Sequence, residues 1–165
     1  MRYIFLLILT LMSCTSFGFR GSLPSDIKTL YIENFENKAS GGRNLTNDLS
    51  IKVTDSFIAD NTLIQSSKQK ADLIISGAIE QVVDNQVASF NAEGENAPVA
   101  NQYKVFVKVR IKCFYVSQNK DLFQETLREE VTIASTASAF EKDQAIDQVL
   151  DKLSESIVDK VIGYW

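Results

Sequence analysis

The chain has 165 residues, which is enough for one domain with a real hydrophobic core once an N-terminal export segment is set aside. Its formal net charge of −4 at pH 7 argues against bulk nucleic-acid binding, which depends on Lys and Arg to neutralise phosphates. It contains no histidine, which excludes Ser-His-Asp and Cys-His catalysis and removes the commonest transition-metal ligand. We therefore expect a protein that is not an enzyme and that uses no metal or other cofactor.

A short export signal opens the chain. A nearly unbroken apolar run over 3–12 follows Arg2, and it is shorter than the ~20 residues that a membrane-spanning helix needs. A positive start, an apolar run and a small residue together are typical of a secretory signal peptide. We therefore predict a signal peptide over 1–13.

The signal peptide ends in Leu11-Met12-Ser13-Cys14, which resembles a lipobox with Leu at −3, a small residue at −1 and Cys at +1. A lipobox cysteine carries acyl chains such as palmitate, and each buried methylene adds ~0.8 kcal/mol to membrane anchoring. The alternative is a plain signal peptide with a chance cysteine at its end. Thr15 follows, with no Asp there to favour the inner membrane. We predict lipidation of Cys14, a tether over 14–25, and delivery to the periplasmic side of the cell outer membrane.

The first half of the folded part reads as a strand, a loop, a helix and a strand. The segment 27–35 is short and apolar, and 36–44 contains two adjacent glycines. The segment 45–59 has apolar residues at every fourth position, which predicts a helix with one buried face, and Asn44 is a suitable N-cap. A second short strand is expected at 62–65. The apolar positions of the helix are Leu45, Leu49, Val53 and Phe57.

Three longer strands follow in the second half. The segment 71–88 is rich in Ile and Val, 102–116 alternates in polarity, and 122–133 is its partner after a turn at 117–121. Alternation is typical of a strand that is buried on one face only. The expected buried face holds Val105, Val107, Val109, Ile111 and Cys113, and the other face holds Lys104, Phe106, Lys108, Arg110 and Lys112.

A long C-terminal helix closes the chain. Ser138 and Glu141 form the pattern of a capping box, in which each side chain bonds to the backbone of the other. The apolar stripe of the helix is Ile146, Val149, Leu150, Leu153, Ile157 and Val161.

The expected element order is β-α-β-β-β-β-α in a single domain over 26–165. Two amphipathic helices need one apolar sheet face, which predicts an α+β two-layer sandwich: a mostly antiparallel sheet with both helices on one side. The first β-α-β unit should be a right-handed parallel crossover. If the strands then alternate in direction, the loop at 89–101 lies at the tether end of the domain and the C-terminus lies at the opposite end.

Three segments and the lipobox resemble the LptE family of lipopolysaccharide-assembly lipoproteins, in its Bacteroidota form. They are 22–37 (SLPSDIKTLYIENFEN), 45–49 (LTNDL) and 71–79 (ADLIISGAI), and the C-terminal helix fits the same layout. The resemblance implies a protein at the inner leaflet of the outer membrane that plugs the β-barrel LptD. It also implies help in assembling that barrel, contact with lipopolysaccharide on its way to the cell surface, and no covalent chemistry.

Other lipoproteins share a similar unit, so alternatives stay open. One is an LpoB-like regulator of peptidoglycan synthesis, another is a CsgG-like secretion component, and a third only stabilises some other assembly. An LpoB-like protein usually has a long disordered tether, whereas this one ends near residue 25. A CsgG-like protein needs membrane strands that alternate apolar and polar, and the cations of 102–116 fit a sandwich better.

The basic row on the strand 102–116 is the main candidate site, and it consists of Lys104, Lys108, Arg110 and Lys112 with Phe106 between them. Lipopolysaccharide carries phosphates and acidic sugars, which cations bind through charge-assisted hydrogen bonds. Phe106 would add an apolar contact for a lipid or for a barrel wall. The alternative is a solvated strand face, whose cations pair across strands with Glu80, Glu125 and Glu130.

Four smaller features complete the sequence. The loop 89–101 is long enough to enter a partner or to be disordered. Glu129 and Glu130 point to opposite faces of one strand, so they cannot act as a catalytic pair. Cys113 is expected to be a buried and inert thiol. The terminal aromatic pair at 164–165 fits either a partner contact or a cover for the helix end.

Overall fold

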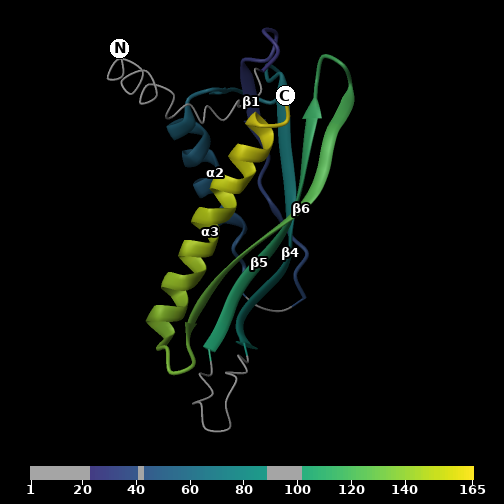
Figure 1. Ribbon diagram of the computed structural model, residues 1–165. Coiled ribbons are helices and arrows are strands. Elements are labelled where there is room, and N and C mark those ends of the chain that lie inside the picture. Colours follow the sequence, from purple (N-terminus) through teal and green to yellow (C-terminus); the bar gives the residue numbers. More distant parts are fainter. Residues whose placement is uncertain (1–22, 41–42, 89–101) are drawn as a thin grey trace, which may run out of the picture.

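The computed structural model describes residues 23–40, 43–88 and 102–165, so the signal peptide, Cys14 and the loop 89–101 lie outside the described residues. A six-stranded mixed sheet lies under two helices, both on the same face (Figure 1). This arrangement confirms the predicted α+β two-layer sandwich. The elements are β1 (Thr29–Ile32), β2 (Glu36–Asn37), α2 (Thr46–Asp60), β3 (Ile64–Gln65), β4 (Leu73–Ala88), β5 (Gln102–Tyr115), β6 (Lys120–Ala134) and α3 (Ala139–Ile162).

One hydrophobic core lies between the sheet and the helices. The predicted stripe of α3 is buried at every position, and so are the five alternating positions of β5 from Val105 to Cys113. α2 contributes Leu49, Val53 and Phe57. Each such side chain stabilises the fold by roughly 1.5–3 kcal/mol when it is fully buried. The amphipathic patterns therefore identify the core correctly.

A side-chain cap defines the start of α3 but not that of α2. The capping box of α3 is confirmed, because Ser138 Oγ accepts from the Glu141 amide at 3.3 Å and Glu141 Oε2 accepts from the Ser138 amide at 2.7 Å. α2 begins one residue later than expected, at Thr46, so the prediction of Asn44 as N-cap is wrong: the N-cap is Leu45, which makes no side-chain capping hydrogen bond. The side chain of Asn44 nevertheless accepts a hydrogen bond from the Thr46 amide at 3.1 Å, so it satisfies a free helix N–H.

The sheet order is β3-β1-β4-β5-β6, and the predicted strand directions are wrong in one respect. β1 pairs in parallel with β3, as expected, but it also pairs in parallel with β4, with Leu30 opposite Leu73. β3 has only two residues, so the connection 66–72 can return to the start of β1 before β4 begins. β4, β5 and β6 then form a long antiparallel meander.

Because β4 runs parallel to β1, the loop 89–101 and the C-terminus are each attached at the end of the domain opposite to the predicted one. The proximal end is where β1 begins and where the described chain starts at Leu23. The distal end is where β4 ends and β5 begins. The ring of Trp165 lies 6.2 Å from the ring of Tyr115, so the C-terminus lies at the proximal end (Figure 1). The residues that flank the loop 89–101 lie at the distal end, opposite to the predicted place.

A two-residue strand, β2, forms within the segment that was expected to be a loop. Glu36 pairs with Ala78 of β4 in parallel. Just before it, Phe35 is buried against Gly77, where a Cβ atom would lie only 2.4 Å from the Phe35 ring. The missing side chain of Gly77 therefore lets Phe35 enter the core and brings β2 alongside β4.

Asp72 ties the connection before β4 to the start of β1. Its carboxylate accepts hydrogen bonds from the Lys28 amide at 2.9 Å, the Thr29 amide at 2.9 Å and Thr29 Oγ1 at 2.8 Å. Burial raises the pKa of Asp72, but these hydrogen bonds outweigh burial and hold the pKa below its ordinary value of 3.8. A lowered pKa means that the stabilisation is present above pH 3.8 and is lost as the pH falls through the folded-state pKa.

We expect Asp72→Ala to lower the free energy of unfolding by about 2 kcal/mol at pH 7, because it removes three hydrogen bonds to a charged acceptor. The difference from the wild type should shrink below pH 3.8, and urea unfolding at neutral and acid pH measures it. Asp121→Ala is the control, since Asp121 is half-exposed and its ion pair should contribute under about 1 kcal/mol. An equal loss at both pH values would contradict a role for the carboxylate charge.

Candidate functional site

The basic row lies on the face of the sheet that the helices leave open. The odd-numbered positions of β5 from Val105 to Tyr115 are buried under the helices, and the even-numbered positions point the other way. The side chains of Lys104, Lys108, Arg110 and Lys112 are 32%, 42%, 54% and 41% exposed, so solvent and ligands reach all four. The alternation of one strand thus places the row as the sequence predicts.

An ion-pair ladder crosses this open face and joins β4, β5 and β6. It includes Arg128, a cation of β6 that the sequence reasoning missed. Five cations share three carboxylates, so the ladder carries two surplus positive charges. The pairs are Lys104–Glu130 (2.7 Å), Lys108–Glu80 (3.7 Å), Arg110–Glu80, Lys112–Asp121 (2.9 Å) and Arg128–Glu130 (2.9 Å).

Two of the three acids expected to pair with the row do so. Glu80 and Glu130 bind its cations, whereas Glu125 points to the helix side and pairs with Lys160 of α3 at 2.7 Å. The hydrogen bond from Lys104 outweighs burial and, with nearby cations, holds the pKa of Glu130 below its ordinary value. Glu130 is therefore ionised at neutral pH and pairs with its cations as a carboxylate.

Phe106 is not an open apolar contact. Its side chain is only 6% exposed, and the guanidinium carbon of Arg128 lies 4.2 Å from the centre of its ring. A ligand on this face would therefore meet the Arg128 guanidinium before the ring. Arg128 also lies directly opposite Lys108 in the β5–β6 register, and like charges in that position destabilise a sheet. The sequence does not determine the register of β6 against β5. That register would have shown that Arg128 lies beside the basic row.

A shallow hollow of about 270 Å³ adjoins the ladder, next to β2. Arg110 and Lys112 line it from β5, and Lys38 follows β2. Glu33 and Glu36 line the same hollow, so its charge is mixed. The open face thus presents its surplus positive charge as a flat array rather than in a deep pocket.

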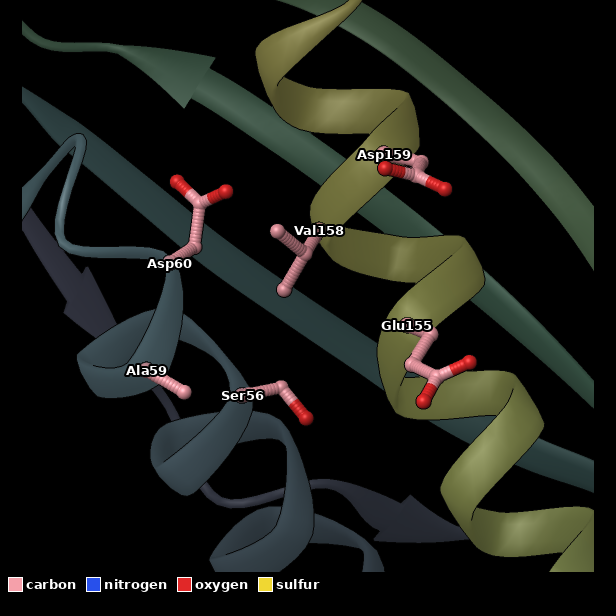
Figure 2. A pocket seen from close by; sticks show the side chains of 6 residues that line it. All are labelled: Ser56, Ala59, Asp60, Glu155, Val158 and Asp159. Carbon is pink, nitrogen blue, oxygen red and sulfur yellow. The ribbon is translucent and has the colours of Figure 1, made fainter.

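A groove of about 370 Å³ lies on the helix side, between the C-terminal halves of α2 and α3 (Figure 2). Asp60, Glu155 and Asp159 line it, together with Ser56. Ser56 Oγ donates to Ser154 Oγ at 2.9 Å across the two helices. Across the described ranges, no three His, Cys, Asp or Glu side chains are grouped so that they could hold a metal ion. The groove is therefore an acidic seam between the helices.

Glu129, Glu130 and Cys113 lie where the sequence predicts. Glu129 and Glu130 lie on opposite faces, as predicted, because Glu129 Oε1 accepts from Ser156 of α3 at 2.8 Å. Cys113 is 1% exposed, and burial raises the pKa of its thiol to about 12. The thiol therefore stays protonated at neutral pH, and the predicted burial of Cys113 is confirmed.

Cys14 and the lipobox lie outside the described residues, so lipidation stays a prediction. Among the helices of residues 23–40, 43–88 and 102–165, none has the length and apolar character to cross a membrane.

Several solved structures share the fold at low sequence identity. The protein CT253 of Chlamydia trachomatis is 14% identical, with a TM-score of 0.62 over 84% of this chain and 97% of that one. XCC0632 of Xanthomonas campestris is 12% identical, with a TM-score of 0.58 over 86% and 87% of the two chains. A minor lipoprotein of Acinetobacter baumannii is 14% identical, with a TM-score of 0.53 over 81% and 91%. These similarities establish the fold, and no curated protein matches the sequence.

The family is established by the sequence itself. The model of the LptE family, described as lipopolysaccharide-assembly, matches residues 27–161. This range runs from just before β1 almost to the end of α3, so it includes the core and the whole basic row. The chain therefore belongs to the LptE family of lipopolysaccharide-assembly proteins.

Proposed function

We propose that this protein is a lipoprotein anchored through Cys14 on the periplasmic side of the outer membrane. There it plugs an LptD-type β-barrel, assists the assembly of that barrel, and contributes to lipopolysaccharide transport to the cell surface. The match of the LptE family to residues 27–161 carries the proposal. The lipobox supports it from outside the matched range, since it supplies a means of anchoring.

The basic row is the proposed contact for lipopolysaccharide. The phosphates of lipopolysaccharide would bind Lys104, Lys108, Arg110 and Lys112. The ring of Phe106 would contact the Arg128 guanidinium from the core side. Two observations support this contact: the ladder has two cations more than carboxylates, and Lys108 lies directly opposite Arg128. An anion placed between those two cations would relieve their repulsion.

The first test is a pull-down of the full-length tagged lipoprotein from native membranes in mild detergent, followed by mass spectrometry. We expect stoichiometric recovery of a large outer-membrane β-barrel of the LptD type. Recovery of a peptidoglycan synthase would favour the LpoB-like alternative, and a secretion complex would favour the CsgG-like one. Recovery of an unrelated assembly would favour the third alternative, a lipoprotein that only stabilises that assembly.

A second test addresses the basic row. We expect the triple variant Lys108→Gln, Arg110→Gln, Glu80→Gln to bind purified lipopolysaccharide at least about tenfold more weakly, because each charge-assisted hydrogen bond contributes ~1.5–3 kcal/mol. Including Glu80 avoids leaving its carboxylate, which is 19% exposed, without cations. Fluorescence titration with lipopolysaccharide measures the affinity.

A matched control separates specific contact from net charge. The variant Arg43→Gln, Lys52→Gln, Asp143→Asn lies on the helix side and also removes two cations and one acid, including the Arg43–Asp143 ion pair of 2.7 Å. This control lies outside the ladder and should leave the affinity within about twofold, since it removes no proposed contact. Equal weakening by both variants would show that the binding depends on overall charge alone.

A further inference from the structure

One carboxylate, that of Glu80, faces both central cations of the basic row. It lies 3.7 Å from Lys108 Nζ and also pairs with Arg110. It is the most enclosed acid of the ion-pair ladder, since its side chain is 19% exposed, against 37% for Glu130 and 49% for Asp121. The carboxylate of Glu80 therefore already occupies the position in which an anionic ligand of Lys108 and Arg110 would have to bind.

A β-bulge in β4 brings Glu80 to this position. Ile79 lies opposite Val109 and Gln81 lies opposite Lys108, so Glu80 is an extra residue without a partner in β5. Successive residues of a regular strand point to opposite faces, whereas here Glu80 and Gln81 both lie on the side of the cations. Bulges recur where a strand must re-aim a side chain. The bulge thus places one more side chain, a carboxylate, on the open face than a regular strand would.

Lys108 is the most loosely bound cation of the ladder. Its ammonium group lies 3.7 Å from Glu80, which exceeds the length of a hydrogen bond, whereas Lys104 and Lys112 bind their acids at 2.7 and 2.9 Å. Lys108 also lies directly opposite Arg128, whose like charge repels it. An added anion would therefore gain more from contact with Lys108 than from contact with the lysines that are already hydrogen-bonded.

The open face has room for an anion beside Arg110. Ala78, which has a small side chain, lies directly opposite Arg110, and both line the shallow hollow of about 270 Å³ together with Lys112. Glu33 and Glu36 also line the hollow, but each already pairs with a lysine. An anion can therefore approach Arg110 through this hollow, and it then competes with Glu80 for the same guanidinium group.

Charge favours a phosphate over the carboxylate, yet the carboxylate lowers the gain. A phosphate monoester carries about −1.5 to −2 charges at pH 7 and offers three acceptor oxygens, whereas a carboxylate offers one charge and two oxygens. A displaced Glu80 stays attached to β4, so its charge repels the bound phosphate at short range. When the phosphate leaves, the carboxylate returns to the same cations, which are then not left unpaired. Both effects favour release of the ligand.

We propose that Glu80 is an internal competitor of lipopolysaccharide phosphates at Lys108 and Arg110, and that it speeds the release of the lipid from the basic row. The inference deepens the proposed function and rests on the basic row being a contact for lipopolysaccharide. A protein on a transport route must release its cargo as well as bind it, so a contact of limited affinity suits this role.

Removing the charge of Glu80 tests the competition directly. We expect the full-length lipoprotein with Glu80→Gln to bind purified lipopolysaccharide roughly five- to tenfold more tightly than the wild type, since the phosphate no longer competes with two ion pairs. The gain should appear mainly as slower dissociation. Fluorescence titration measures the affinity, and stopped-flow release into excess unlabelled lipopolysaccharide measures the dissociation rate. Glu80→Met is a second uncharged variant of similar length, and it should give the same gain if Glu80→Gln folds poorly.

A matched variant on the other side of the sheet controls for net charge. Glu125→Gln also removes one carboxylate that pairs with a cation, in this case Lys160 of α3 at 2.7 Å. Because Glu125 points to the helix side, this control should leave the affinity within about twofold of the wild type. Equal tightening by Glu80→Gln and Glu125→Gln would overturn the competition, since overall charge would then explain the gain.

A change in the ligand shows which of its anionic groups Glu80 opposes. Lipopolysaccharide stripped of its phosphates with hydrofluoric acid keeps its acidic sugars, and Glu80→Gln should bind this material no more tightly than the wild type does. A gain that persists with the stripped ligand would overturn the assignment to phosphates.

The same titrations separate a failure of this inference from a failure of the proposed function. If the wild type binds intact lipopolysaccharide and Glu80→Gln binds it equally or more weakly, the competition is overturned while the contact stands. If neither protein binds it, the basic row is not a contact for lipopolysaccharide, and the inference is overturned with it.

Discussion

Replacing Cys14 by serine is expected to abolish acylation and to release from the membrane every copy of the protein that the proposed partner barrel does not hold. Serine has no thiol to carry the acyl chains, and a lipobox cysteine gains ~0.8 kcal/mol of anchoring from each buried methylene of two or three chains. No described helix can replace such an anchor by spanning the bilayer. Membrane fractionation and labelling with radioactive palmitate measure the effect. Labelled protein should fall to background, and in an overproducing strain the copies in excess of the barrel should move to the soluble fraction.

The second cysteine of the chain is the natural control for this experiment. Cys113→Ser removes a buried thiol that burial keeps protonated, so the label and the membrane fraction should be retained. The variant will be less stable, because it places a hydroxyl in an apolar site, and growth at reduced temperature separates that effect from targeting. Retention in the membrane of the excess copies of Cys14→Ser would mean that something other than a lipid on this residue anchors the protein.

A second large effect is expected at Gly77, whose missing side chain leaves room for Phe35. A Cβ atom there would lie 2.4 Å from Phe35 Cε1 and 2.8 Å from the Arg110 carbonyl oxygen. Phe35 is buried, and the carbonyl belongs to β5, so neither neighbour can move freely. Gly77→Ala should lower the free energy of unfolding by about 2–3 kcal/mol, as measured by urea denaturation.

Two further variants show whether overpacking is the cause. Ser76→Ala alters the adjacent residue, which points to the open face, and should change stability by less than about 0.5 kcal/mol. Phe35→Leu in the Gly77→Ala background should recover part of the loss, because a smaller side chain leaves space for the new methyl group. Additive losses in the double variant would mean that the two residues do not compete for the same space.

The sequence predicts the local elements well, because the physical signals that form them are local. The alternation of β5 predicts that Val105 to Cys113 are buried and that the cations are exposed, since successive strand residues point to opposite faces. The stripe and the Ser138 capping box predict α3. The opposite orientations of Glu129 and Glu130 follow from the same two-residue period. These results need no knowledge of which strands pair.

The pairing of strands is where the sequence reasoning fails. The direction of β4 depends on how the short connection 66–72 returns beside β1, and Asp72 fixes that return with hydrogen bonds to residues more than 40 positions away. β2 forms only because Phe35 finds space at Gly77. Both features depend on contacts between residues distant in the chain, which no local pattern encodes.

The candidate site shows the same division. The sequence by itself determines which residues form the basic row, because their spacing along one strand follows from backbone geometry. Only the tertiary structure decides that Arg128 covers Phe106, that Glu80 and Glu130 bind the row, and that the C-terminal aromatic pair lies beside the start of β1. Strand register and the order of strands set these contacts, and both result from packing the whole sheet against α2 and α3.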